Sequence, residues 1–178
     1  MSGHNKWSKI KNKKAVTDAQ KSKIFGKLVR FIAVESKKAK GDVNAPGLRT
    51  AIEKAKEANV PSDNIERAIK KGGGGEGDEM EQITYEAYGP GGCALIIEAL
   101  TENRNKAAQE IKHILTKNGF ELAVPGSATW AFEKKIGSSE WLPKNTTQIS
   151  EEDGARLEIL INELEENDEV QEVFTNAE

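Results

Sequence analysis

Cysteine, histidine and aromatic residues are scarce in this sequence, and their scarcity excludes several classes of protein. The 178 residues include one cysteine, Cys93, and two histidines. A single cysteine cannot form an intrachain disulfide, and no spacing of cysteine and histidine resembles a metal site. We therefore expect no metal, no cofactor, and a reducing cytoplasm as the location.

Long apolar runs are missing as well. No stretch approaches the roughly 20 apolar residues that a membrane helix needs, and Met1–Lys6 lacks the apolar segment of a signal peptide. No serine or cysteine stands in a pattern that supplies it with a base, and the carboxylates are dispersed. We predict a protein that is not an enzyme, with neither a membrane nor a small molecule as its partner.

Acidic residues are nearly absent from the first forty positions. This segment holds twelve Lys or Arg and two acidic residues, a net charge of +10, whereas the whole chain carries −3. Such asymmetry predicts a polyanionic partner, because each cation placed against a phosphate releases a bound counterion. The alternative is a disordered solubilising tail, but Trp7 within the basic run favours binding. The predicted nucleic-acid contacts of this segment are His4, Lys6, Trp7, Lys9, Lys11, Lys13, Lys14, Lys21, Lys23, Lys27 and Arg30.

The apolar residues change their period along the chain. After a basic arm over residues 1–14, helical spacing predicts three helices that share one core over residues 15–71. Residues 72–78 are predicted to be a glycine-rich linker. Over residues 79–178 an alternating period predicts strands near 83–88, 93–100, 128–133, 146–150 and 170–174, with helices near 105–118 and 151–166. The expected fold class is α+β: a three-helix domain followed by a ferredoxin-like βαββαβ domain with an extra N-terminal strand.

A second candidate contact follows the strand near 93–100. Asn103, Arg104, Asn105 and Lys106 stand where a helix is predicted to begin, and free N–H groups at a helix N-terminus attract anions. Ordinary capping of the helix by Thr101 or Asn103 explains the same residues equally well.

Several segments of the sequence resemble the YebC/PmpR family. The matching residues are Met1–Trp7 with Ile10 and Lys11, Ala58–Pro61, Asn64–Gly72, Tyr85–Gly92, Thr101–Asn105 and Asp168–Val173. The resemblance implies a probable transcriptional regulator that binds DNA. It implies as the alternative a ribosome-associated factor that contacts ribosomal RNA and activates translation or relieves stalling. An adaptor that acts through the acidic C-terminal domain has less support, and the oligomeric state stays open.

One departure from that family stands out. Its members have about 240 residues, with a further α+β unit inserted after a Phe-Glu-Lys-Lys strand. Here Phe132–Lys135 leads almost directly into the terminal segment, so the inserted third domain is expected to be missing near residues 136–140. Any function that the family places in that domain is in doubt for this chain.

Overall fold

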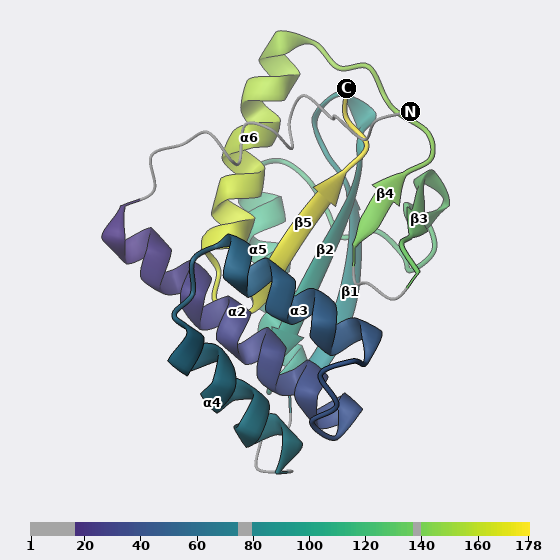
Figure 1. The fold of residues 1–178 in the computed structure, drawn as a ribbon. Helices are drawn as coiled ribbons and strands as arrows, with labels where there is room; N and C mark the ends of the chain where they lie inside the picture. Colours follow the sequence, from purple (N-terminus) through teal and green to yellow (C-terminus); the bar gives the residue numbers. More distant parts are fainter. Residues whose placement is uncertain (1–16, 75–79, 137–139) are drawn as a thin grey trace. The chain divides into compact units, whose positions relative to one another are not determined.

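The structure, a computed structural model, describes residues 17–74, 80–136 and 140–178 (Figure 1). Contacts divide these residues into two compact units, a three-helix unit that ends at Met80 and an α+β unit over residues 81–135 and 140–178. In the part of the chain that is described, no helix has the length and apolar composition to cross a membrane.

Three helices form the first unit: α2 (Asp18–Ala39), α3 (Pro46–Glu57) and α4 (Ser62–Gly73). A capping box between Thr17 and Gln20 begins α2, because each side chain bonds a backbone N–H that the helix itself leaves unpaired. The apolar faces meet in one core, which contains the buried side chains Ile32, Leu48, Ala51, Ala55, Val60, Ile65 and Ala68. The expected three-helix arrangement is confirmed.

The predicted linker begins too early, because its first two glycines belong to α4. Gly72 is buried against α2, where a Cβ atom would lie 2.2 Å from the Ala33 carbonyl oxygen. Beside it the Ser36 hydroxyl donates to the Ile69 carbonyl at 2.6 Å. Glycine composition is typical of flexible chain, yet here glycine lets two helix backbones approach closely. Residues 75–78 of the predicted linker lie outside the described residues.

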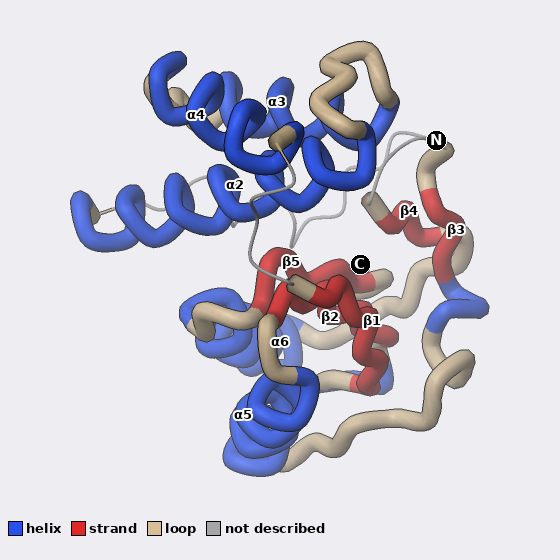
Figure 2. Tube along the Cα trace, turned by 90° about the horizontal axis from the view of Figure 1, so that it is seen from below, coloured by secondary structure: helices blue, strands red, loops and turns tan. Residues whose placement is uncertain are grey.

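The second unit is built on a three-stranded antiparallel sheet of order β1 (Glu81–Tyr88), β2 (Ala94–Thr101) and β5 (Val170–Thr175). A 3-10 turn, η1 (Pro90–Gly92), joins the first two strands. Helices α5 (Arg104–Lys117) and α6 (Glu151–Glu166) cover one face of the sheet (Figure 2). Their core includes the buried residues Leu95, Ile97, Ile111, Leu115, Leu157 and Leu160.

A hairpin covers the other face of the sheet, as Figure 2 shows. Strands β3 (Phe132–Lys134) and β4 (Trp141–Pro143) pair with each other, after the 3-10 turn η2 (Thr129–Ala131). Phe132 packs there with Ala94 and Ile96 of β2, and every residue of β2 is buried. The α+β class and the extra N-terminal strand are confirmed.

Two of the predicted strands differ from the structure. The strand expected at 128–133 is shortened to β3, because Thr129–Ala131 form η2. The strand expected at 146–150 is not formed; Thr147 makes a single bridge to Ala177. Its β-branched residues suit a strand, but Ser150 caps α6 and ends the extended segment. Within the described residues, β3 and β4 therefore lie over the three-stranded sheet rather than within it.

Candidate nucleic-acid interface

Four basic residues of α2 lie on one face of that helix. Lys23, Lys27, Arg30 and Lys37 are spaced i, i+4, i+7 and i+14, which places them on one side of an α-helix. At 1.5 Å per residue they extend over about 21 Å. We call these four residues the basic stripe. Of the α2 residues predicted from the sequence, Lys21 alone falls outside it.

Beside the basic stripe, α2 and α4 enclose a groove of about 470 Å³. Two cations from each helix line it, Arg30 and Lys37 from α2 and Arg67 and Lys71 from α4. The rest of the lining is mainly apolar and includes Phe25, Gly26, Val29, Ala33, Val34, Ala68 and Met80. Sequence reasoning missed the α4 cations, although their i, i+4 spacing on a predicted helix is a signal that could have found them.

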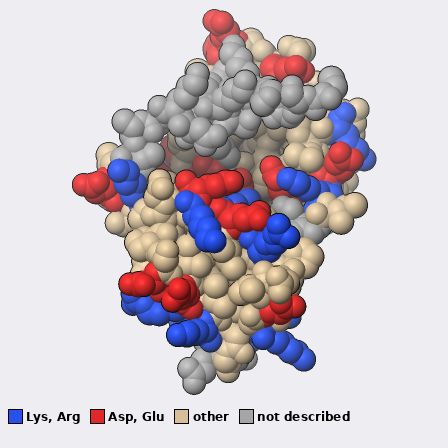
Figure 3. Space-filling view, viewed as in Figure 1, with Lys and Arg blue, Asp and Glu red and all other residues tan. Residues whose placement is uncertain are grey.

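The excess of positive charge belongs to the three-helix unit. Its described residues 17–74 include thirteen basic and seven acidic side chains, a net charge of +6. The described residues of the α+β unit include eight basic and nineteen acidic side chains, a net charge of −11. On the face seen in Figure 3, basic and acidic side chains are interspersed. The case for a nucleic-acid interface therefore depends on the ordered spacing along α2 rather than on a uniformly basic surface.

The second candidate contact is a capped helix start. The Asn103 side chain accepts from the Lys106 backbone N–H at 3.1 Å. The Thr101 hydroxyl accepts from the Asn103 N–H and donates to the Asn103 carbonyl, both at 2.9 Å. These bonds satisfy groups that an anion would otherwise approach. The geometry supports the capping interpretation that the sequence had left open.

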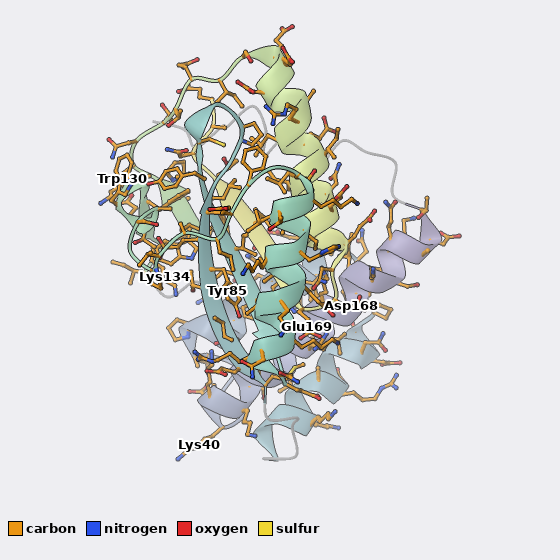
Figure 4. All side chains as sticks on the ribbon, turned by 180° about the vertical axis from the view of Figure 1, so that it is seen from behind. Lys40, Tyr85, Trp130, Lys134, Asp168 and Glu169 are labelled. Carbon is orange, nitrogen blue, oxygen red and sulfur yellow. The ribbon has the colours of Figure 1, made fainter. Side chains whose placement is uncertain are left out.

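Both cations of this helix start have acidic partners inside the unit. Arg104 bonds the Glu81 carboxylate, with Nε 3.2 Å from Oε2, and Lys106 Nζ lies 3.2 Å from Glu169 Oε1. Glu169 is seen beside α5 in Figure 4. The hydrogen bond from Arg104 lowers the pKa of Glu81, and the bond to Glu169 raises the pKa of Lys106. A nucleic acid would have to displace these carboxylates, so Asn103, Arg104, Asn105 and Lys106 stay a prediction with less support than the basic stripe.

Replacing Arg104 by alanine should raise the pKa of Glu81 toward its ordinary value. Since Arg104 lowers that pKa in the folded protein, the pair stabilises the fold at neutral pH, and this contribution is lost as the pH falls through the lowered pKa. A titration of the Glu81 carboxyl carbon by NMR measures the change. Lys117→Ala, which acts on Glu163 instead, should leave the Glu81 titration in place.

An exposed aromatic pair on the α+β unit was not anticipated from the sequence. The Trp130 indole N–H donates to the Tyr88 hydroxyl at 2.9 Å, and that hydroxyl in turn donates to the Ser127 carbonyl. Trp130 is 54% exposed and lies at the periphery of the unit (Figure 4). Residues 42 positions apart form this pair, and no local pattern indicates that they meet.

The predicted contacts of the basic arm lie outside the described residues. These are His4, Lys6, Trp7, Lys9, Lys11, Lys13 and Lys14, and their role in binding stays a prediction.

The sequence of this chain matches models of a known protein family. A family model for the TACO1/YebC N-terminal domain matches residues 5–75, and a model for the TACO1/YebC second and third domains matches residues 80–137 and 135–177. The chain belongs to the TACO1/YebC family.

Relatives within the TACO1/YebC family carry regulatory names. A "probable transcriptional regulatory protein" of Fervidobacterium nodosum is 41% identical over 235 positions, which cover 99% of this chain and 93% of that protein. One of Trichlorobacter lovleyi, with the same name, is 48% identical over 98% of this chain and 70% of that protein. The crystal structure of a conserved hypothetical protein from Aquifex aeolicus matches with a TM-score of 0.82 and 35% identity, covering 98% of this chain and 97% of that one. The names of the Fervidobacterium and Trichlorobacter relatives describe regulatory proteins.

The same comparisons bear on the length of this TACO1/YebC member. Its 178 residues are aligned over 235 positions with the Fervidobacterium protein, so that relative has residues for which this chain has none. The model of the second and third domains matches in two segments that meet at residues 135–137.

Proposed function

We propose that this protein is a nucleic-acid-binding regulator that contacts the phosphate backbone of duplex DNA through the basic arm and the basic stripe. The spacing of Lys23, Lys27, Arg30 and Lys37 along one face of α2 is the observation that carries the proposal. The names of its relatives, which describe transcriptional regulators, support the same function.

Contacts of this kind supply affinity rather than sequence selectivity. Lysine and arginine placed against phosphates release condensed counterions, and the binding constant then falls steeply with salt. Selectivity would require contacts to base edges in a groove of the DNA. The basic stripe of α2 would therefore supply the sequence-independent part of binding.

Changing Lys23 and Lys27 together to alanine should weaken binding to duplex DNA and flatten its salt dependence. Each lost phosphate contact lowers the slope of log K against log salt by about 0.9, so we expect the slope to fall by about 1.8. Fluorescence anisotropy at several salt concentrations measures both quantities. A matched control, Arg49→Ala with Lys56→Ala on α3, removes the same charge away from the stripe and should change the slope much less.

An unchanged slope in the Lys23 and Lys27 variant would remove the basic stripe from the interface. Co-sedimentation with ribosomes tests the alternative target in parallel. If ribosomes bind the protein while duplex DNA does not at physiological salt, ribosomal RNA replaces DNA as the target, and the protein is a translation factor.

A further inference from the structure

The groove between α2 and α4 has an apolar lining that phosphate contacts do not use. Val29, Ala33 and Val34 contribute to it from α2, and Ala68 contributes from α4. Phosphates need cations and hydrogen-bond donors, whereas apolar lining gains free energy only when another apolar surface covers it. The groove is therefore suited to a ligand that has both carboxylate or phosphate groups and an apolar side.

Gly26 lies in this groove, in the interior of α2, and nothing in the described structure explains why the residue is glycine. Its backbone is helical, so no left-handed conformation requires glycine. Apart from its chain neighbours and the adjacent backbone of α2, no atom of the described residues lies within 4 Å of the position that a Cβ would occupy. Glycine weakens a helix interior relative to alanine. Its benefit here is a bare backbone, which allows another chain to approach α2 closely.

The length of the groove and its side chains fit a helix better than a nucleic-acid strand. Its lining on α2 runs from Ser22 to Lys37, about 22 Å at 1.5 Å per residue, or four turns. Base binding uses aromatic faces, but among the described residues that line the groove Phe25 alone is aromatic. That ring is also partly buried against the core of the unit. Aliphatic grooves between helices accept the apolar face of an amphipathic helix, read at i, i+3, i+4 and i+7.

The positive charges that line the groove favour a bound helix with a negative net charge. Arg30 and Lys37 come from one side and Arg67 and Lys71 from the other. The Arg67 guanidinium donates to the Asn64 side-chain oxygen at 3.2 Å and to the Asp63 carbonyl at 3.4 Å. Both acceptors are neutral, so they leave the positive charge of Arg67 uncompensated. Guanidinium groups pair with carboxylates in a two-bond geometry.

We propose that the α2–α4 groove binds an acidic amphipathic helix of a protein partner. A row of apolar side chains would lie over Gly26 and Val29, and carboxylates on both sides of that row would pair with the four cations. The site shares Arg30 and Lys37 with the basic stripe, so a partner helix and a nucleic acid compete for the three-helix unit.

The test uses the full chain and a defined probe. The probe is a fluorescein-labelled peptide of 16 residues with leucine at i, i+4, i+7 and i+11 and glutamate beside them. A second peptide has the same composition with the leucines spread around the helix. The first peptide should bind, and the second should bind at least tenfold more weakly.

Gly26→Leu should weaken binding of the first peptide at least tenfold, because the new side chain occupies the groove. Gly26→Ala should give an affinity between those of the parent and Gly26→Leu, because one methyl group takes only part of the space that a close approach to the bare backbone uses. Both variants replace glycine in a helix, so both should unfold at no lower denaturant concentration than the parent. Arg67→Glu, at a largely exposed position, should also weaken binding of the first peptide.

Equal affinity for the two peptides, or full affinity in Gly26→Leu, would overturn the proposal. The proposal would also be overturned if the parent bound neither peptide while Gly26→Leu lost nucleic-acid binding. The groove would then be part of the nucleic-acid site. The proposed DNA contact fails by a different readout, the salt slope of the Lys23 and Lys27 variant, so the two failures can be told apart.

Discussion

Replacing Gly72 by alanine is expected to destabilise the three-helix unit by about 2–3 kcal/mol, the upper range for forcing extra volume into a packed interior. The new Cβ would meet the Ala33 carbonyl oxygen at 2.2 Å, the Ser36 Cβ at 2.7 Å and the Lys37 backbone nitrogen at 3.0 Å. Two of these three atoms belong to the α2 backbone, so no side-chain rotation relieves the contact. The helices α2 and α4 must separate, which also opens the groove and displaces Arg67 from the α2 cations.

Amide hydrogen exchange at Ile32 and Ile65 measures this loss, since both residues are buried in the core that α2 and α4 share. Gly26→Ala is the control within the same unit. It adds the same methyl group where, apart from the adjacent backbone of α2 and the chain neighbours, no described atom lies within 4 Å, and it should stabilise α2 by about 0.5–1 kcal/mol. Equal protection in the Gly72 and Gly26 variants would contradict the close approach at Gly72.

Replacing Glu86 by alanine is expected to destabilise the α+β unit by about 1–3 kcal/mol, because the buried Ala128 N–H would be left without an acceptor. The Glu86 carboxylate accepts from three backbone N–H groups, those of Gly126 at 2.6 Å, Ala128 at 2.7 Å and Thr129 at 2.9 Å. Its side chain is buried. One side chain of β1 thereby fixes the segment that leads into the β3–β4 hairpin.

Urea unfolding followed by tryptophan fluorescence measures the effect, because Trp130 lies just after this segment and Trp141 lies in β4. Glu86→Gln keeps one acceptor oxygen and should fall between the parent and the alanine variant. Glu133→Ala removes an exposed carboxylate of β3 and should change stability by less than about 0.5 kcal/mol. If the Glu86 and Glu133 alanine variants unfold at the same urea concentration, the three hydrogen bonds make no net contribution to the stability of the unit.

The β3–β4 hairpin also explains how the two strands are connected without an inserted domain. The Lys135 N–H donates to the Glu140 carbonyl at 2.9 Å, so β3 returns directly into β4. The Trp141 indole N–H donates to the buried Glu98 carboxylate at 2.7 Å, which attaches β4 to the sheet. We propose that the residues present in longer relatives belong to a domain inserted at this hairpin, which the sheet does not need for its own core.

Much of the fold could be predicted from the sequence. The helical period of Ile24–Ile32 and the alternation over Ile83–Tyr88 indicated α2 and β1, because the period of apolar residues fixes both the type of element and the face that it buries. The charge asymmetry predicts that the basic end of the chain contacts a polyanion, and this stays a prediction. The strand expected at 146–150 was wrong. Thr147 and Ile149 make three backbone hydrogen bonds with Asn176 and Glu178, but these amount to one isolated bridge and not to a strand of the sheet.

The sequence by itself determined most of the elements, their apolar faces and the excess of cations in the first unit. Only the tertiary structure decided what those residues meet. In the structure Gly72 packs against α2 and is not part of a linker. Arg67 lines the same groove as two residues of the basic stripe. Arg104 and Lys106 contact acidic residues that lie 23 and 63 positions away in the sequence. The physical reason is that local period fixes how a segment folds, whereas contacts between distant residues depend on how the folded segments pack.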